Sequence, residues 1–210
     1  GLRGQEMAGR SPDVHAAGRA RSVEDPLAGA LGMVPVDALA DAATLPDALS
    51  SVLRNLDDDV SSADACRSIV RQLPDAPAFF GAALIEIAEA ADRSGLFNAY
   101  HNPVHSRDVG VIFVNLMRLQ AMLESGAAKP DVTDFLTGCC AAFGHDVGHD
   151  GTDGGPDAEP FRLEKIAADT VGGIMERHTV DFHLIERAYC AIMATEVQNG
   201  YRALEKAGRG

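Results

Sequence analysis

The sequence contains no tryptophan, and only 5% of its residues are aromatic. Ala, Leu, Val and Ile must therefore fill the interior, because 46% of the residues are hydrophobic. At 210 residues the chain is long enough for one domain with a full core, or for part of a larger one. We expect a helical domain whose core is built from small side chains.

Basic residues are also scarce. The chain has 18 Lys and Arg against 31 Asp and Glu, which gives a formal net charge of −13. Such a chain repels phosphate backbones and anionic lipids, so nucleic acids and anionic membrane surfaces are not expected partners. An anionic substrate would need metal ions to offset the field of the protein.

The four cysteines, Cys66, Cys139, Cys140 and Cys190, form no CxxC pair. They are expected to be reduced and buried thiols, which is the pattern of cytoplasmic proteins. No apolar run approaches the ~20 residues that a membrane span needs, and the chain shows no signal-peptide core at its start. The expected location is the cytoplasm, either for the chain itself or as a cytoplasmic domain of a larger protein.

An all-α fold is predicted, because apolar residues recur at helical spacing and no alternating strand pattern occurs. Residues 1–43 are expected to be a flexible lead-in, and residues 44–210 a multi-helix bundle. Helices are predicted over residues 44–56, 62–73, 77–94, 104–124, from 131 through the apolar run 135–143, and over 161–177 and 182–196. The run 135–143 suits a central helix that others surround. Residues 148–160 are expected to be a loop.

Two short blocks hold four of the seven histidines. The block YHNPVHSRDV contains His101 and His105, and the block GHDVGHDG contains His145 and His149. In each block the histidines are four residues apart, which places both imidazoles on one face of a helix. Two such pairs could therefore meet around one metal ion.

Asp146 directly follows His145, so on a regular helix the two side chains would point about 100° apart. They can converge on one ion only where the helix ends or bends, and Gly144 and Gly148 flank them. Imidazole and carboxylate are suitable ligands for zinc, iron or manganese. A single HxxxH pair is more often an accident of a helix surface than a site. Two pairs with an adjacent His-Asp, set in apolar helices, favour a metal site.

The two blocks resemble the YHNxxHAxDV and HDxxHPG signatures of class I 3′,5′-cyclic nucleotide phosphodiesterases, a branch of the HD superfamily. The segments IMERH and ATEV, which contain Glu176 and Thr195, resemble two further motifs of that family, VLExHH and ATDM. The resemblance covers residues 97–197. It implies an all-α catalytic domain that hydrolyses cyclic AMP (cAMP), cyclic GMP (cGMP) or both to 5′-nucleoside monophosphates in signal transduction.

The resemblance also implies two divalent cofactor ions. His105, His145 and Asp146 match protein ligands of a first ion, which is zinc in character. Asp146 would bridge to a second ion that is Mg²⁺ or Mn²⁺ in character and otherwise coordinated mostly by water.

Other residues match groups around these ions. His101 matches the general acid that protonates the departing 3′ oxygen, and His149 matches a histidine close to the hydroxide between the ions. Glu176 and Thr195 match groups that hold waters on the second ion. Asn102 and Asp108 match groups that support the loop and the helix start. For both residues, a purely structural role fits equally well.

The sequence departs from the family at several positions. Asp150 stands where the family has proline, Thr179 replaces a histidine, and Glu196 replaces an aspartate. The family supplies its last metal ligand, its purine-binding glutamine and its aromatic clamp farther along than Gly210. We therefore expect a catalytic domain that is incomplete at its C-terminus and nearly inactive by itself. Substrate-binding residues, cAMP or cGMP preference and oligomeric state are left open.

Two other functions fit the same residues. The first is an HD-type phosphohydrolase that acts on another substrate, such as a nucleotide. The second is a non-catalytic regulatory module that has kept the metal-binding half of the site. Hydrolysis of a cyclic nucleotide would separate the leading function from the first alternative, and bound metal without turnover would favour the second.

Overall fold

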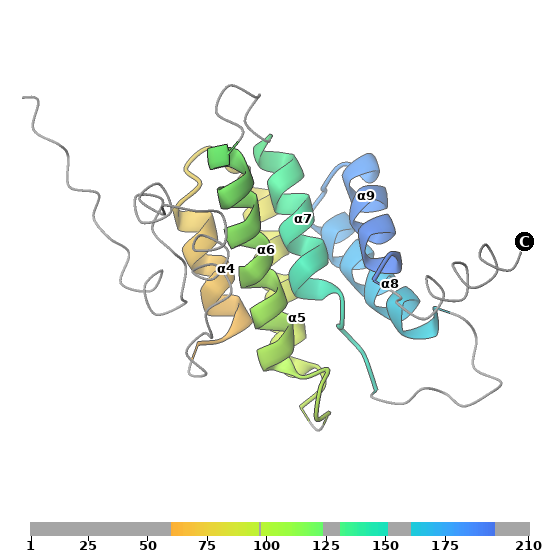
Figure 1. Cartoon of the computed structure of the whole chain (residues 1–210). Coiled ribbons are helices and arrows are strands. Elements are labelled where there is room, and N and C mark those ends of the chain that lie inside the picture. Colours follow the sequence, from red (N-terminus) through yellow and green to blue (C-terminus); the bar gives the residue numbers. More distant parts are fainter. Residues whose placement is uncertain (1–59, 97, 124–130, 151–160, 196–210) are drawn as a thin grey trace, which may run out of the picture.

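The computed structural model describes residues 60–96, 98–123, 131–150 and 161–195. Within these ranges the chain forms a bundle of six helices without a strand, so the predicted all-α fold is confirmed there (Figure 1). The helices are α4 (Ser62–Arg71), α5 (Ala78–Arg93), α6 (Pro103–Leu123), α7 (Val132–Gly144), α8 (Arg162–Arg177) and α9 (Phe182–Met193). The lead-in 1–43, the helix predicted over 44–56 and most of the 148–160 loop lie outside the described residues.

Polar side chains determine where several helices begin. Asp131 accepts a hydrogen bond from the backbone N–H of Thr133 at 2.7 Å and caps α7. Asn102 accepts one from the N–H of His105 at 3.0 Å at the start of α6. These bonds satisfy N–H groups that a helix leaves unpaired in its first turn. The expected support of the helix start by Asn102 is confirmed.

Helix α7 lies at the centre of the bundle and packs against α5, α6, α8 and α9. Cys139 and Cys140 on α7, like Cys66 on α4, are fully buried. Burial raises the pKa of the Cys139 and Cys140 thiols, so both stay protonated and act as apolar packing groups. The prediction of buried thiols is wrong for Cys190, which is exposed because it lies on the solvent side of α9.

Helices α6 and α7 run antiparallel and approach closely at two glycines (Figure 1). A Cβ added to Gly110 on α6 would lie 2.4 Å from Cε1 of Phe143, and one added to Gly138 on α7 would lie 2.3 Å from Cζ of Phe113. Each glycine therefore accommodates an aromatic ring from the other helix. This packing places the first turn of α6 beside the last turn of α7, where the two histidine blocks lie.

Arg107 is a charged side chain inside the bundle and is only 1% exposed. Its Nε and Nη2 donate to Oδ1 of Asp108 at 2.9 and 2.7 Å, and its Nη1 donates to the backbone carbonyl of Val60 at 3.1 Å. Asp108 thus supports the first half of α6 by pairing with a buried guanidinium, which is costly to bury without a partner.

The longest described helix is α6, with 21 residues. None of the helices in the described ranges is both long and apolar enough to cross a lipid bilayer. Their apolar side chains instead form one contiguous core.

The glycine packing yields a stability prediction. Gly110→Ala should lower the free energy of unfolding by about 1–3 kcal/mol, because the added methyl meets the fully buried ring of Phe143. Gly173→Ala on α8 is the matched control. Its added methyl would have only Nη1 of Arg177 nearby, at 3.9 Å. Gly173→Ala should raise the free energy of unfolding by about 0.4–1 kcal/mol. Chemical denaturation measures both, and equal effects of the two changes would contradict the account.

Candidate metal centre

The two histidine blocks meet at one end of the bundle. His101 precedes α6, and His105 lies in its first turn. His145, Asp146 and His149 follow the end of α7 directly. The segments that carry them are more than 30 residues apart in the chain, so the α6–α7 packing is what brings them together.

The end of α7 explains how His145 and Asp146 converge. Gly144, its last residue, lies so close to α8 that an added Cβ would be 2.4 Å from Cγ2 of Val171. The chain then turns, with hydrogen bonds from Val147 N–H to the Gly144 carbonyl and from His149 N–H to the Asp146 carbonyl, each at 3.1 Å. The predicted break of the helix at this point is confirmed. Regular helical geometry no longer separates the adjacent imidazole and carboxylate.

His105, His145 and Asp146 form a first donor group, whose potential ligand atoms all lie within 4.8 Å of one another. Nε2 of His105 is 3.4 Å and Nε2 of His145 is 3.2 Å from Oδ2 of Asp146. The centroids of the two rings are 5.3 Å apart. The predicted convergence of the blocks is confirmed, and the group could hold a metal ion.

The hydrogen bonds of His145 suit a metal ligand. Its Nδ1 lies 2.9 Å from the backbone carbonyl of Ala142, which can only accept a hydrogen bond, so Nδ1 carries the proton. In the neutral ring Nε2 is then the unprotonated nitrogen, free to bind a metal ion, and it is the atom that faces Asp146. Histidines that bind metals are oriented in this way by a backbone carbonyl or a carboxylate.

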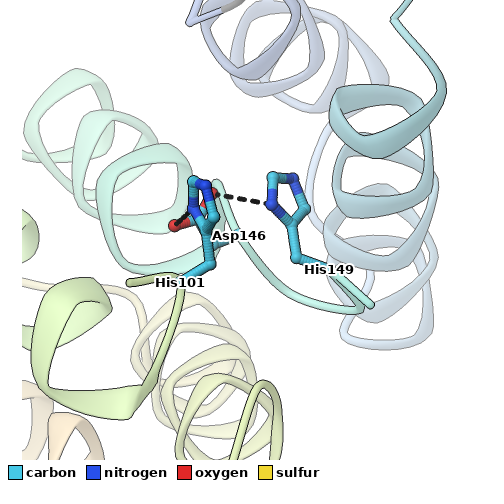
Figure 2. Close-up of side chains that lie close together, drawn as sticks. All are labelled: His101, Asp146 and His149. Atoms are coloured by element: carbon cyan, nitrogen blue, oxygen red, sulfur yellow. Dashed lines mark hydrogen bonds and ion pairs between the residues drawn. The ribbon is translucent and has the colours of Figure 1, made fainter. Parts of the chain in front are cut away.

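His101, Asp146 and His149 form a second donor group, also with ligand atoms within 4.8 Å of one another (Figure 2). Nδ1 of His101 is 2.8 Å from Oδ2 of Asp146, and Nδ1 of His149 is 3.4 Å from Oδ1. His149 is 7% exposed, and neither of its ring nitrogens has a hydrogen-bond partner. A buried imidazole without hydrogen bonds is costly, so a ligand that engages it would stabilise the site.

Burial and mutual contacts determine the protonation of the group. Burial lowers the pKa of His105 and of His149, which favours the neutral imidazoles that metals need. Burial also opposes charge on His145 and Asp146. The hydrogen bond and charge between these two outweigh it, which raises the pKa of His145 and holds that of Asp146 well below its usual value. Asp146 is therefore a carboxylate.

Neither donor group includes Glu176. Glu176 is exposed near the end of α8, where the next residues, Arg177 and His178, each lie 2.6 Å from carboxylate oxygens of Glu86 on α5. Thr195 donates its hydroxyl to the carbonyl of Ile192 at 2.7 Å, at the end of α9. Their assigned roles of holding waters on a second ion stay predictions.

Three further residues around the centre were given no site role in the sequence analysis. Ser94 accepts a hydrogen bond from the N–H of Gly148 at 2.6 Å and so holds the turn after α7. The ring of Tyr100 lies 4.6 Å, centroid to centroid, from that of His105. Asp150 forms two 3.0 Å bonds with the guanidinium of Arg162. For Asp150, the sequence contained one indication of an unusual role, which is a charged residue at a position where the family motif has proline.

Comparison with protein-family models, curated proteins and solved structures finds no match to the chain. The family resemblance therefore depends on the quoted motifs alone. The structure independently provides the all-helical fold and the convergence of the two blocks.

The first donor group yields a prediction about metal binding. His105→Ala and His145→Ala should each weaken zinc binding by more than the ~10–100-fold typical of changes to outer-shell partners, because each removes a direct ligand. His183→Ala, which removes an exposed histidine from α9, should leave it unchanged. Competition titration with a chromophoric chelator measures the affinities. Equal zinc affinity in all three variants would show that the group does not bind the metal.

Proposed function

We propose that this protein is a metal-dependent phosphodiesterase that hydrolyses the 3′,5′-cyclic nucleotides cAMP, cGMP or both to 5′-nucleoside monophosphates in signal transduction. The observation that carries the proposal is the convergence of the two histidine blocks on the Asp146 carboxylate. The likeness of those same blocks to phosphodiesterase signatures supports this reaction over other metal-dependent chemistry.

The donor groups fit two divalent ions. Two imidazoles and a carboxylate, as in His105, His145 and Asp146, suit zinc. A second ion, Mg²⁺ or Mn²⁺, would use the same carboxylate, since Mg²⁺ favours one or two carboxylates with water. When bound, such ions supply Lewis acidity that activates water and offsets the charge of the phosphoryl group.

His101 is proposed to act as the general acid. Its Nδ1 is held by Asp146 at 2.8 Å, which fixes the ring and leaves Nε2 to carry a transferable proton. In the reaction, a water oxygen forms a bond to phosphorus and gives up one proton to solvent, and the bond from phosphorus to the 3′ oxygen breaks. The 3′ oxygen takes the proton of Nε2, so the ring opens to a hydroxyl and a 5′-monophosphate.

One observation favours a second candidate function. Asp150 stands where the family has proline, is paired with Arg162, and lines a cavity beside His149. The wall next to the centre therefore carries an ionisable side chain where the family motif has proline. This difference favours, as the alternative, an HD-type phosphohydrolase whose substrate is another organic phosphate, such as a nucleotide.

The assay that tests the proposal is hydrolysis of cAMP and cGMP with zinc and magnesium supplied. The family pattern places its last ligand beyond Gly210, so the assay should include a form of the protein extended past that residue. We expect turnover by the extended form and its abolition by His145→Ala. Release of phosphate from nucleotides without cyclic nucleotide hydrolysis would favour the second candidate. Bound metal without any turnover would favour a non-catalytic module.

The role of His101 yields a separate prediction. His101→Ala should lower kcat by about 10²–10⁴-fold, the usual contribution of a general acid, while the zinc content of the first donor group stays unchanged. His183→Ala serves as the control for both measurements. Elemental analysis of the purified variants measures the metal. Zinc loss in His101→Ala equal to that in His105→Ala would instead make His101 a metal ligand.

A further inference from the structure

A cavity of about 510 Å³ opens beside the metal centre. Its walls come from the end of α5, the segment that leads to α6, and the residues after α7, and they comprise Arg93, Gly95, Leu96, Asn98, Ala99, His149 and Asp150. The volume falls within the ~300–1,000 Å³ range of small-molecule sites. His149 belongs both to this cavity and to the second donor group, so a ligand in the cavity would adjoin the centre.

The charge of the cavity wall favours an anion. Arg93, the last residue of α5, has no ion-pair or hydrogen-bond partner within the described part of the chain. Asp150 is the acidic residue of the wall, and the guanidinium of Arg162 pairs with both of its carboxylate oxygens at 3.0 Å. The negative charge in the wall is thus offset, whereas the positive charge of Arg93 is not. In a chain with a net charge of −13, an unpaired cation facing a cavity marks a place for a negatively charged ligand.

Asn98 adds a hydrogen-bond donor with a fixed orientation. Its Oδ1 accepts bonds from the backbone N–H groups of Tyr100 and His101 at 3.0 and 3.2 Å. These two bonds assign the amide oxygen and nitrogen, because a backbone N–H can only donate. Nδ2 is then a buried donor, and it has no partner. The ring nitrogens of His149 also lack hydrogen-bond partners, so the partly buried Asn98 and the buried His149 both have unused hydrogen-bonding capacity.

We propose that this cavity is a subsite that binds the phosphate group of an organic phosphate, with Arg93 and Asn98 as its binding residues. The inference deepens the proposed function, on which it rests for the identity of the ligand, since substrate and product of that reaction are organic phosphates. Leu96, which is 64% exposed, provides an apolar wall for the organic part. Arg93 neutralises the phosphate, and Asn98 donates a hydrogen bond to one of its oxygens.

Calorimetric titration with inorganic phosphate and with 5′-AMP tests the subsite. Both ligands are titrated into chelator-treated protein and into zinc-loaded protein, because bound ions also attract phosphate. Arg93→Ala should weaken binding of both ligands about tenfold or more in both forms, the usual scale for a charged hydrogen bond. Arg67→Ala is the matched control. It also removes one positive charge, but that arginine already pairs with Asp64 and Glu89. The control should bind both ligands as the unaltered protein does.

A second variant keeps the test decisive. Asn98→Asp retains the oxygen that accepts from Tyr100 and His101 and replaces the amide donor by a negative oxygen. It should weaken phosphate binding at least as much as Arg93→Ala does, in protein whose helical circular dichroism spectrum is unchanged. Phosphate affinities of Arg93→Ala and Asn98→Asp equal to those of the unaltered protein would overturn the subsite. So would 5′-AMP binding no tighter than inorganic phosphate.

The experiments distinguish a failure of the proposed subsite from a failure of the proposed function. A protein that binds phosphate through Arg93 but leaves cyclic nucleotides intact retains the subsite and lacks the proposed activity. A protein that hydrolyses cyclic nucleotides, with phosphate affinity unaffected by Arg93→Ala, has the activity and lacks the subsite.

Discussion

The candidate site depends on the carboxylate of Asp146, which contacts all four histidines of the two blocks. Its Oδ2 lies 2.8 to 3.4 Å from nitrogens of His101, His105 and His145, and its Oδ1 lies 3.4 Å from Nδ1 of His149. Asp146 is only 4% exposed, and a carboxylate buried without partners would be strongly destabilising. The surrounding imidazoles offset that cost. The same arrangement leaves two donor groups that share a single carboxylate, which is the geometry a bridging ligand needs.

The packing of the bundle holds the histidines around Asp146. One segment is at the start of α6 and the other at the end of α7, and in this antiparallel pair the two lie side by side. A shift of α6 along α7 would therefore separate them. Gly110 and Gly138 limit that shift, because each accommodates a ring, Phe143 and Phe113 respectively, from the facing helix. Gly144 then lets the end of α7 approach α8 where the chain turns. Small residues in the core are thus linked directly to the geometry of the candidate site.

Much of the fold and part of the site could be predicted from the sequence, because both depend on local patterns. Apolar spacing locates the described helices closely, and the four-residue spacing of the histidines places each pair on one face. Whether a residue such as Cys190 is buried or exposed depends on which helices pack against its own helix. The spacing of apolar residues does not predict that packing. The cavity with Arg93 and Asn98 was missed for the same reason. It forms only where α5, the segment before α6 and the end of α7 meet.

The central claim is that the two histidine blocks bind one metal centre. X-ray absorption at the zinc edge tests it most directly, because scattering from imidazole rings differs from that of sulfur or of water alone. For the zinc-loaded protein the account predicts two imidazole nitrogens at about 2.0–2.1 Å together with oxygen ligands. A first shell without imidazole, or one with sulfur at about 2.3 Å from a thiol such as the exposed Cys190, would contradict it.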